Sequence, residues 1–393
     1  MQQKKILFVI NSLSHGGAEK VLSMLANSFS KKKLFTVEIV MLENIRTYYV
    51  SKDIPVTTLS QNTHNSAVKK FLMLPIDAIR LAKYIKKSNP DVVISFIFRA
   101  DFVNILSSLI TKKPTIVSVR VHASSTYHQK SISAAINKFL IRTLYPKANA
   151  IINVSKGTQQ DLIKNFHIPK TKQCVIYNPY ETDKIEKLAK QPLRKKLPPL
   201  QKRRTCIIVS RLRPIKNIEM IIEIFATLPK DIHLLIVGDG PHEKTLKAKV
   251  NALKLYDRII FTGPQENPFQ YMEQAAIYLS ASNAEGFPNA LVEAMLCGCA
   301  VISTDCPSGP REILAPQTPY DAFLKNGFEE TPYGILVAVN DQDAYKNAIL
   351  ELLENHRKRE LLSIAAKKRA SDFQLENILA QYTKKIEEVI RTS

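Results

Sequence analysis

Two glutamates and the short loop between them form the strongest local signal for chemistry in this chain. Seven residues separate Glu285 from Glu293, and residues 286–289 contain a glycine and a proline. A turn of this composition after a strand directs backbone N–H groups and a helix N-terminus toward a ligand, which suits a diphosphate and a sugar hydroxyl. Because carboxylates repel phosphate, the natural partners of the two glutamates are hydroxyl groups. The alternative is that Glu293 only stabilises the first turn of a helix through the helix dipole.

A second signal lies where a predicted strand, 206–210, ends. Arg211 and Lys216 follow this strand on the loop that leads into a predicted helix. A guanidinium fork and an ammonium point charge can together hold a pyrophosphate. An isolated pair of this kind is more often two solvated loop cations, so its place at the carboxyl end of a strand is what favours a binding role.

Strands and helices alternate along both halves of the chain. The first half begins with an apolar run at 5–10 and a helical pattern from Ala18, and it continues with a predicted strand at 92–98 and a helix at 102–110. Such alternation predicts a parallel sheet covered by helices on both faces. Ligands of open parallel sheets bind at the carboxyl ends of the strands, so two facing domains would share one cleft.

The chain divides into two predicted domains and a linker. Residues 1–180 and 205–375 each contain one alternating series, and residues 181–204 between them are polar, basic and rich in proline. We expect residues 376–393 to form a C-terminal helix that could pack back on the first domain. The predicted fold class is α/β, with two doubly wound, Rossmann-like domains.

Four ordered motifs resemble the retaining glycosyltransferase family four, whose fold is GT-B. The chain contains Arg211 with Lys216, the segment 235–241, Glu285 to Glu293, and the segment 298–304 in the order of that family. The resemblance spans nearly the whole chain. It implies transfer of a hexose or N-acetylhexosamine from a nucleotide sugar, with UDP as the expected nucleotide. The segment 305–314 resembles the branch that builds lipid-linked or polysaccharide glycans of bacterial envelopes.

The resemblance also implies a role for individual residues. Arg211 and Lys216 would neutralise the donor diphosphate, Glu293 would bind the ribose, and Glu285 would contact the transferred sugar. Donor contacts are further expected at seven glycine and loop positions: Gly16, Gly17, Gly238, Gly286, Phe287, Pro288 and Asn289.

Retention without a metal ion is a further implication of the resemblance. The sequence has no Asp-x-Asp pair, so fixed cations would stabilise the leaving group, and we expect no metal site and no cofactor besides the donor substrate. The family often has a histidine near the acceptor, after a strand of the first domain. Here Arg120 and His122 are both candidates for that catalytic position, and His122 is the preferred one.

Charge is distributed unevenly along the chain. Residues 1–180 contain 26 Lys and Arg against 8 Asp and Glu, whereas the whole chain has a net charge of +21. In this architecture the first domain receives the acceptor, so its cations favour an anionic glycolipid or polysaccharide acceptor and peripheral contact with an anionic membrane. The segment 132–147 has apolar and cationic faces suited to an interface. An ordinary core-facing helix is the alternative.

Other functions and locations are less consistent with the sequence. A nucleic-acid-binding protein lacks a recognised motif, and a dinucleotide-dependent oxidoreductase lacks Gly-x-Gly-x-x-Gly in the first loop, 14–18. A sugar-nucleotide epimerase of the same architecture remains an alternative. The five cysteines form no metal-binding pattern, and the first apolar run is too short for a signal peptide or a spanning helix. We therefore expect a cytoplasmic protein on the inner face of the membrane.

Overall fold

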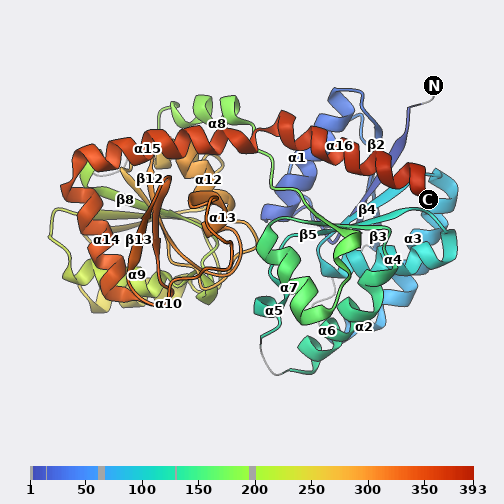
Figure 1. The fold of residues 1–393 in the computed structure, drawn as a ribbon, viewed down its shortest axis with the longest axis horizontal. Coiled ribbons are helices and arrows are strands. Elements are labelled where there is room, and N and C mark those ends of the chain that lie inside the picture. The colour runs from blue at the N-terminus through green and yellow to red at the C-terminus, as the bar shows by residue number, and fades with distance from the viewer. Residues whose placement is uncertain (1–2, 15, 61–66, 129–130, 194–200) are drawn as a thin grey trace. The chain divides into compact units, whose positions relative to one another are not determined.

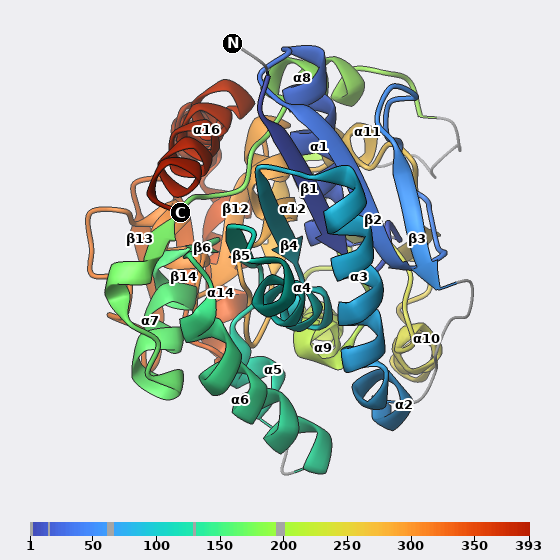
Figure 2. The same cartoon turned by 90° about the vertical axis from the view of Figure 1, so that its right-hand side faces the viewer.

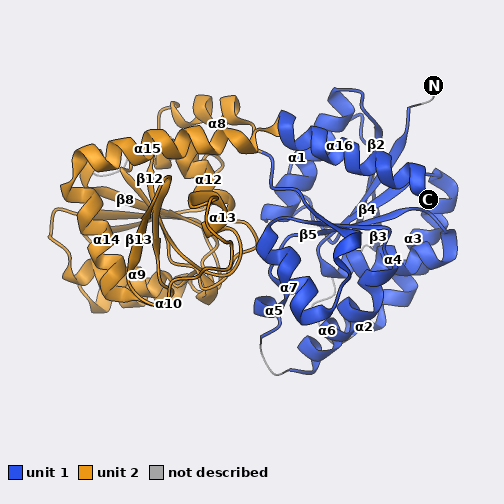
Figure 3. Cartoon of the chain, viewed as in Figure 1, with its two compact units in different colours: residues 1–179, 376–393 blue, residues 180–375 orange. Residues whose placement is uncertain are grey.

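The protein folds into two compact units, as shown by a computed structural model (Figures 1 and 3). The structure describes residues 3–14, 16–60, 67–128, 131–193 and 201–393. Unit 1 comprises residues 1–179 and 376–393, and unit 2 comprises residues 180–375. Each unit has one seven-stranded sheet. The predicted α/β class with two Rossmann-like sheets is confirmed.

All strands of the unit 1 sheet are parallel, in the order β3-β2-β1-β4-β5-β6-β7. The central strands are apolar and buried on both faces, as parallel sheets require. The strands are β1 (Lys5–Ile10), β2 (Thr36–Glu43), β3 (Val56–Ser60), β4 (Val92–Phe96), β5 (Thr115–Val119), β6 (Ala150–Asn153) and β7 (Gln173–Val175).

Helices cover both faces of this sheet (Figure 2). One core cluster unites α1 with α16 against the sheet, and the other unites α3, α4 and α6. The helices are α1 (Gly17–Lys31), α2 (Ala67–Leu72), α3 (Leu74–Ser88), α4 (Phe98–Thr111), α5 (Ala123–Thr126), α6 (Ile132–Leu144) and α7 (Lys156–Phe166).

The unit 2 sheet has the order β10-β9-β8-β11-β12-β14-β13, and only β13 runs antiparallel to its neighbour. Its strands are β8 (Thr205–Val209), β9 (His233–Val237), β10 (Ile259–Gly263), β11 (Ile277–Ser280), β12 (Ala300–Thr304), β13 (Phe328–Thr331) and β14 (Gly334–Val337). The helices are α8 (Thr182–Ala189), α9 (Ile218–Thr227), α10 (Glu243–Ala252), α11 (Phe269–Met272), α12 (Asn289–Leu296), α13 (Pro310–Leu314), α14 (Gln342–Glu354) and α15 (His356–Ala370).

The C-terminal helix α16 (Leu375–Thr392) returns to unit 1. Its buried residues recur at helical spacing and join the core cluster of β1 and α1. They are Ile378, Leu379, Tyr382, Ile386 and Val389. The chain therefore crosses between the units twice, near residues 179 and 375.

Two local predictions differ from the structure. The strand predicted at 92–98 ends at Phe96, and α4 begins at Phe98, because Ile97 takes a φ of 76° and reverses the chain. The predicted linker 181–204 contains α8, whose buried Ile185 and Ala189 help it pack on α11 and α12 of unit 2. Residues 194–200 of that linker lie outside the described residues.

Candidate functional site

Three loops at the carboxyl ends of β8, β9 and β11 hold the residues that the sequence predicts for the donor. Lys216 lies after β8, Gly238 directly follows β9, and Glu285 lies after β11. Because β9, β8 and β11 are adjacent and parallel, their carboxyl ends share one edge of the unit 2 sheet. The fold thus gathers residues separated by about 70 positions at one place.

Lys216 and Glu285 form an ion pair at this edge. The Lys216 Nζ lies 2.6 Å from Glu285 Oε1, and the Ser282 hydroxyl donates to the same oxygen at 2.7 Å. The side chains of Lys216 and Glu285 are 24% and 12% exposed. This partial burial weakens solvent screening, so the pair holds a cation and a carboxylate in fixed geometry within reach of a ligand.

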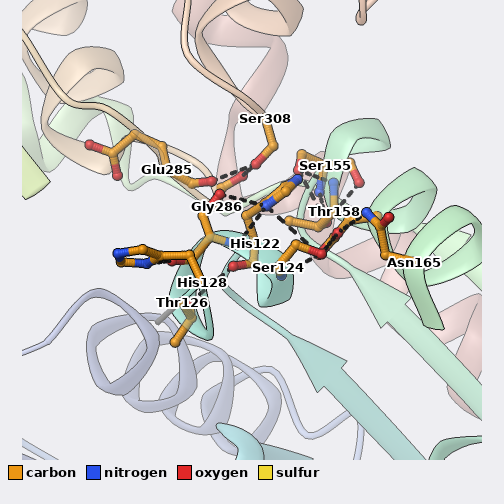
Figure 4. A network of polar contacts seen from close by, with 12 residues as sticks. His122, Ser124, Thr126, His128, Ser155, Thr158, Asn165, Glu285, Gly286 and Ser308 are labelled. Atoms are coloured by element: carbon orange, nitrogen blue, oxygen red, sulfur yellow. Dashed lines mark hydrogen bonds and ion pairs between the residues drawn. The ribbon is translucent and has the colours of Figure 1, made fainter. Parts of the chain in front are cut away.

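The turn after Glu285 is held by a residue of the next strand-to-helix loop. The Ser308 hydroxyl lies 2.6 Å from the carbonyl oxygen of Glu285 and 3.0 Å from that of Gly286 (Figure 4). At Gly309, φ is 98°, and an added Cβ would lie 2.5 Å from Pro288 Cδ. Residues 308–309 therefore fix the path of the Glu285 loop, and position 309 requires glycine.

Glu293 is buried on α12, with 6% of its surface exposed. Burial raises the pKa of the neighbouring Tyr278 phenol far above its usual value, and the charges of Glu285 and Glu293 raise it further. Both carboxylates therefore act on one tyrosine beneath the loop. Among the described residues no side chain caps α12 at its N-terminus, so its positive end remains available to favour an anion.

The loop after β9 packs backbone to backbone on the loop after β8. Gly238 has a φ of 131°, and a Cβ there would lie 2.0 Å from the carbonyl oxygen of Ser210. The Leu212 amide donates to the carbonyl of Asp239 at 2.7 Å. These contacts hold the segment that carries Arg211, whose side chain is exposed. Gly238 thus has a structural reason to be glycine whether or not a ligand approaches it.

The side chains of Phe287 and Asn289 have partners inside unit 2. The Phe287 ring packs edge-on against Phe373 with centroids 5.4 Å apart. The Tyr180 hydroxyl donates to Asn289 Oδ1 at 2.8 Å. We therefore expect residues 286–289 to contact a donor through their backbone groups.

In unit 1, His122 caps the short helix α5 after β5. Its Nδ1 accepts a hydrogen bond from the Ser125 amide at 3.3 Å and lies 2.9 Å from the Ser125 hydroxyl (Figure 4). Burial lowers the pKa of His122, although the charge of Asp161, 3.7 Å away, opposes this. A neutral ring that accepts at Nδ1 carries its proton on Nε2, so His122 presents Nε2 as a hydrogen-bond donor.

Arg120, the other candidate of this segment, is directed into the core of unit 1. Its guanidinium donates to Asn178 Oδ1 at 2.7 Å and to the Tyr382 hydroxyl, and it lies 4.7 Å from the centroid of the Phe96 ring. The residue is 9% exposed. These contacts join the residue after β5 to Asn178 and to α16, so Arg120 links three parts of unit 1.

Gly16 and Gly17 lie where β1 leads into α1. Gly16 has an extended φ of −162°, and the three atoms nearest to a Cβ there all belong to the Glu19 carboxylate, with Oε2 at 2.1 Å. A flexible side chain can move, so this contact does not by itself require glycine at position 16. His15, in the same loop, lies outside the described residues.

Family comparisons cover both units. The model for "Glycosyltransferase Family 4" matches residues 15–184, and that for "Glycosyl transferases group 1" matches residues 189–369. The chain is 30% identical to the Campylobacter jejuni N-acetylgalactosamine-N,N'-diacetylbacillosaminyl-diphospho-undecaprenol 4-alpha-N-acetylgalactosaminyltransferase, over 94% of this chain and 96% of that protein. It belongs to the family-four glycosyltransferases. The predicted family is confirmed.

Two further matches agree with this assignment. A second Campylobacter jejuni protein, the GalNAc-alpha-(1->4)-GalNAc-alpha-(1->3)-diNAcBac-PP-undecaprenol alpha-1,4-N-acetyl-D-galactosaminyltransferase, is 26% identical over 98% of this chain and 99% of its own length. The crystal structure of Anabaena HepE in complex with UDP and glucose superposes with a TM-score of 0.75 at 22% identity, covering 98% of this chain and 100% of that one. The glycosyltransferase therefore has the GT-B fold. The comparisons give no support to an epimerase or to a nucleic-acid-binding protein.

The glycosyltransferase also contains an ion cluster that the sequence did not reveal. Arg99, in the first turn of α4, contacts Glu43 at the end of β2 and donates to Asp77 Oδ2 of α3 at 2.8 Å. Lys70 lies 3.1 Å from Glu43. No spacing rule links these positions, but Glu43 ends β2 while Asp77 and Arg99 lie in the first turns of α3 and α4, so the fold brings them together at the carboxyl edge of the unit 1 sheet.

Side chains of the types that bind metal ions are dispersed over the described parts of the glycosyltransferase. Within them, His, Cys, Asp and Glu do not gather in threes that could hold a metal ion. All five cysteines are free, and burial raises the pKa of each thiol, for example to about 12 at Cys206. No described helix has both the length and the apolarity needed to cross a bilayer.

Proposed function

We propose that this glycosyltransferase moves an N-acetylhexosamine or hexose from a UDP-sugar to a polyprenyl-diphosphate-linked glycan, with retention of anomeric configuration and without a metal ion. The single observation that carries the proposal is the Lys216–Glu285 pair, 2.6 Å apart at the carboxyl edge of the unit 2 sheet. It offers a cation for a diphosphate beside a carboxylate for sugar hydroxyls.

Unit 2 would bind the donor. Lys216 and Arg211 would neutralise the diphosphate, and the positive end of α12 would add to their field as the UDP leaves. Glu285 would accept a hydrogen bond from the transferred sugar, and Glu293 would hold the ribose. The UDP and glucose of the HepE complex support UDP as the donor nucleotide.

Unit 1 would receive the acceptor. Both Campylobacter jejuni relatives are named for acceptors linked to undecaprenol through a diphosphate, which supports an acceptor of the same class. Its diphosphate matches the basic excess of the first 180 residues. His122 would donate through Nε2 to a sugar oxygen, and Gly16 and Gly17 would leave room for the donor phosphates. Arg120 would support His122 only through the fold of unit 1.

A thermal-shift panel followed by a transfer assay tests the proposal. We expect UDP-N-acetylhexosamines, but not GDP- or ADP-sugars, to raise the melting temperature, and Glu293→Gln to reduce that shift. With a diphosphate-linked polyprenyl glycan, NMR of the product should show the anomeric configuration of the donor, at an undiminished rate in chelator. Consumption of the donor without an acceptor would instead favour an epimerase, and an inverted product would refute retention.

A further inference from the structure

Large apolar side chains are exposed along α2 and the first half of α3. Phe71 and Leu72 end α2 and are 39% and 65% exposed, and Ile76 and Ile79 of α3 are 44% and 50% exposed. Leu74, Leu81 and Ile85 of the same segment are buried. Single exposed apolar residues are common on soluble proteins, but a run of four on neighbouring turns indicates an interaction surface.

The helix α6 has a second apolar stripe besides the one that packs on the core. Ile132 and Phe139 are 82% and 64% exposed, and Ala135 between them is also exposed. Spacings of three and four residues place the three on one face of the helix. The buried Ala134, Ile141 and Leu144 form the face that packs into unit 1. The core therefore accounts for only one of the two apolar stripes of α6.

The two groups of apolar residues lie at the same end of unit 1. α3 leads into β4 and α6 leads, through residues 145–147, into β6. Both helices thus begin near the carboxyl edge of the parallel sheet and run back toward its other edge. Figures 1 and 2 show α2 and α6 at one common end of the unit. We call the exposed residues of α2, α3 and α6 the α2–α3–α6 face.

Cations border these apolar side chains. The second half of α3 exposes Arg80, Lys83, Lys86 and Lys87, and α6 exposes Arg142. Asp77 is the only acidic residue in 67–88; it is fully buried and pairs with Arg99 at 2.8 Å and with Arg80 at 3.6 Å. There is no acidic residue in 132–144. The face therefore combines exposed Phe, Leu and Ile with an excess of positive charge, as interfacial amphipathic helices do.

We propose that the α2–α3–α6 face docks on an anionic lipid leaflet, with Phe71, Leu72, Ile132 and Phe139 entering the acyl boundary. This inference deepens the proposed function, on which it rests for the lipid-linked nature of the acceptor. The cations of α3 then lie at the headgroup level, where each attracts anionic lipid. Because the face begins at the carboxyl edge of the unit 1 sheet, the acceptor diphosphate can reach that edge while its polyprenyl chain stays in the bilayer.

Vesicle sedimentation without any glycolipid or donor tests the face directly. The full chain should bind vesicles of phosphatidylethanolamine with about one quarter phosphatidylglycerol and should release them in high salt. Ile132→Ser with Phe139→Ser should weaken binding about tenfold or more, through lost apolar burial. The matched control is Leu361→Ser with Ile364→Ser, which removes two large apolar residues, 59% and 64% exposed, from α15 of unit 2 and should bind like the wild type.

A charge variant isolates the electrostatic contribution to vesicle binding. Lys83→Glu with Lys87→Glu should weaken binding on the order of tenfold and flatten its salt dependence, whereas the apolar variant should keep the salt dependence of the wild type. All variants should melt like the wild type, because the altered side chains are exposed. Melting scans run beside each sedimentation series check this.

A single tryptophan reports insertion, because the chain contains none. Phe139→Trp should shift its emission to the blue on vesicles and be quenched by lipids brominated on the acyl chain, and Leu361→Trp should do neither. A blue shift of Phe139→Trp that instead follows protein concentration without vesicles would mean that a second copy covers the face, and it would overturn the inference.

The outcomes separate this inference from the proposed function. Vesicle binding lost in the apolar variant but retained in the α15 control supports the face, even if no UDP-sugar stabilises the protein and the proposed function fails. If a UDP-sugar stabilises the wild type but the wild type does not bind vesicles, the membrane-docking inference is wrong and the donor-site proposal is unaffected. The same holds if the apolar and control variants bind vesicles equally.

Discussion

Glu285 Oε1 accepts hydrogen bonds from two side chains, the Lys216 ammonium at 2.6 Å and the Ser282 hydroxyl at 2.7 Å. Lys216→Ala should weaken UDP-sugar binding by about 10- to 100-fold, because a charge-assisted contact to phosphate is lost. Titration calorimetry measures this. Lys247→Ala is the control, since its ammonium pairs with Glu243 on α10. Equal affinities of the two variants would contradict the donor assignment.

Gly309 tests how the Glu285 loop is held. Gly309→Ala should lower the free energy of unfolding by about 1–3 kcal/mol, because φ is 98° and the new Cβ would meet Pro288. Gly263→Ala is a matched control: φ is 73°, but nothing lies within 4 Å of the added Cβ, so only backbone strain of about 1 kcal/mol remains. Urea unfolding compares the two. An equal or larger loss at Gly263 would rule out the contact with Pro288.

A buried ion pair anchors the segment after β12. Arg311 and Asp305 are 2% and 1% exposed, and Arg311 Nη2 lies 2.6 Å from Asp305 Oδ2. Arg311→Met should cost about 3–5 kcal/mol of unfolding free energy, because the Asp305 charge stays buried alone. Adding Asp305→Asn should restore part of it. The Arg204–Asp231 pair, whose carboxylate is 62% exposed, is the control, and Arg204→Met should cost at most about 1 kcal/mol.

His122 should make stability fall on acidification. Burial lowers its folded-state pKa below the unfolded value of about 6.5, so the unfolded state binds protons first as the pH falls. The stabilisation that neutral His122 gives the folded protein is complete above the unfolded-state pKa. It is lost as the pH falls from the unfolded-state pKa toward the folded-state pKa. Urea unfolding between about pH 7.5 and 5.5 should show a smaller slope for His122→Gln than for the wild type.

Much of the architecture could be predicted because it depends on local patterns. The apolar run of β1 and the spacing of Val21, Leu22 and Phe29 on α1 repeat at the periods of a strand and a helix, and each signal lies within a few residues. The spacing of Arg211 and Lys216 likewise placed both on one loop. Glu285 and Glu293 were predicted to flank a turn and a helix start, and the structure has them before and within α12.

Local patterns failed where distant contacts decide. The run from Val92 to Phe98 is uniformly apolar, so it could not show that Ile97 turns the chain. The residues of α8 looked like a linker because they are polar and basic, yet Ile185 and Ala189 find a buried surface on unit 2. For 132–147 the sequence left an interfacial helix and a core-facing helix open, since a periodic pattern reports apolar faces without telling which one the core covers; the structure buries one apolar stripe of α6 and exposes another.

The sequence by itself determined two α/β units, a glycosyltransferase family and the set of candidate residues, because periodicity and motif spacing are properties of short segments. Only the tertiary structure decided which candidates share an edge and which ones have partners within the core of their own unit. It paired Lys216 with Glu285 across 69 residues, and it fixed Arg120 by partners at positions 178 and 382. Such contacts depend on which strands become neighbours, and strand order is set by the packing of the whole unit.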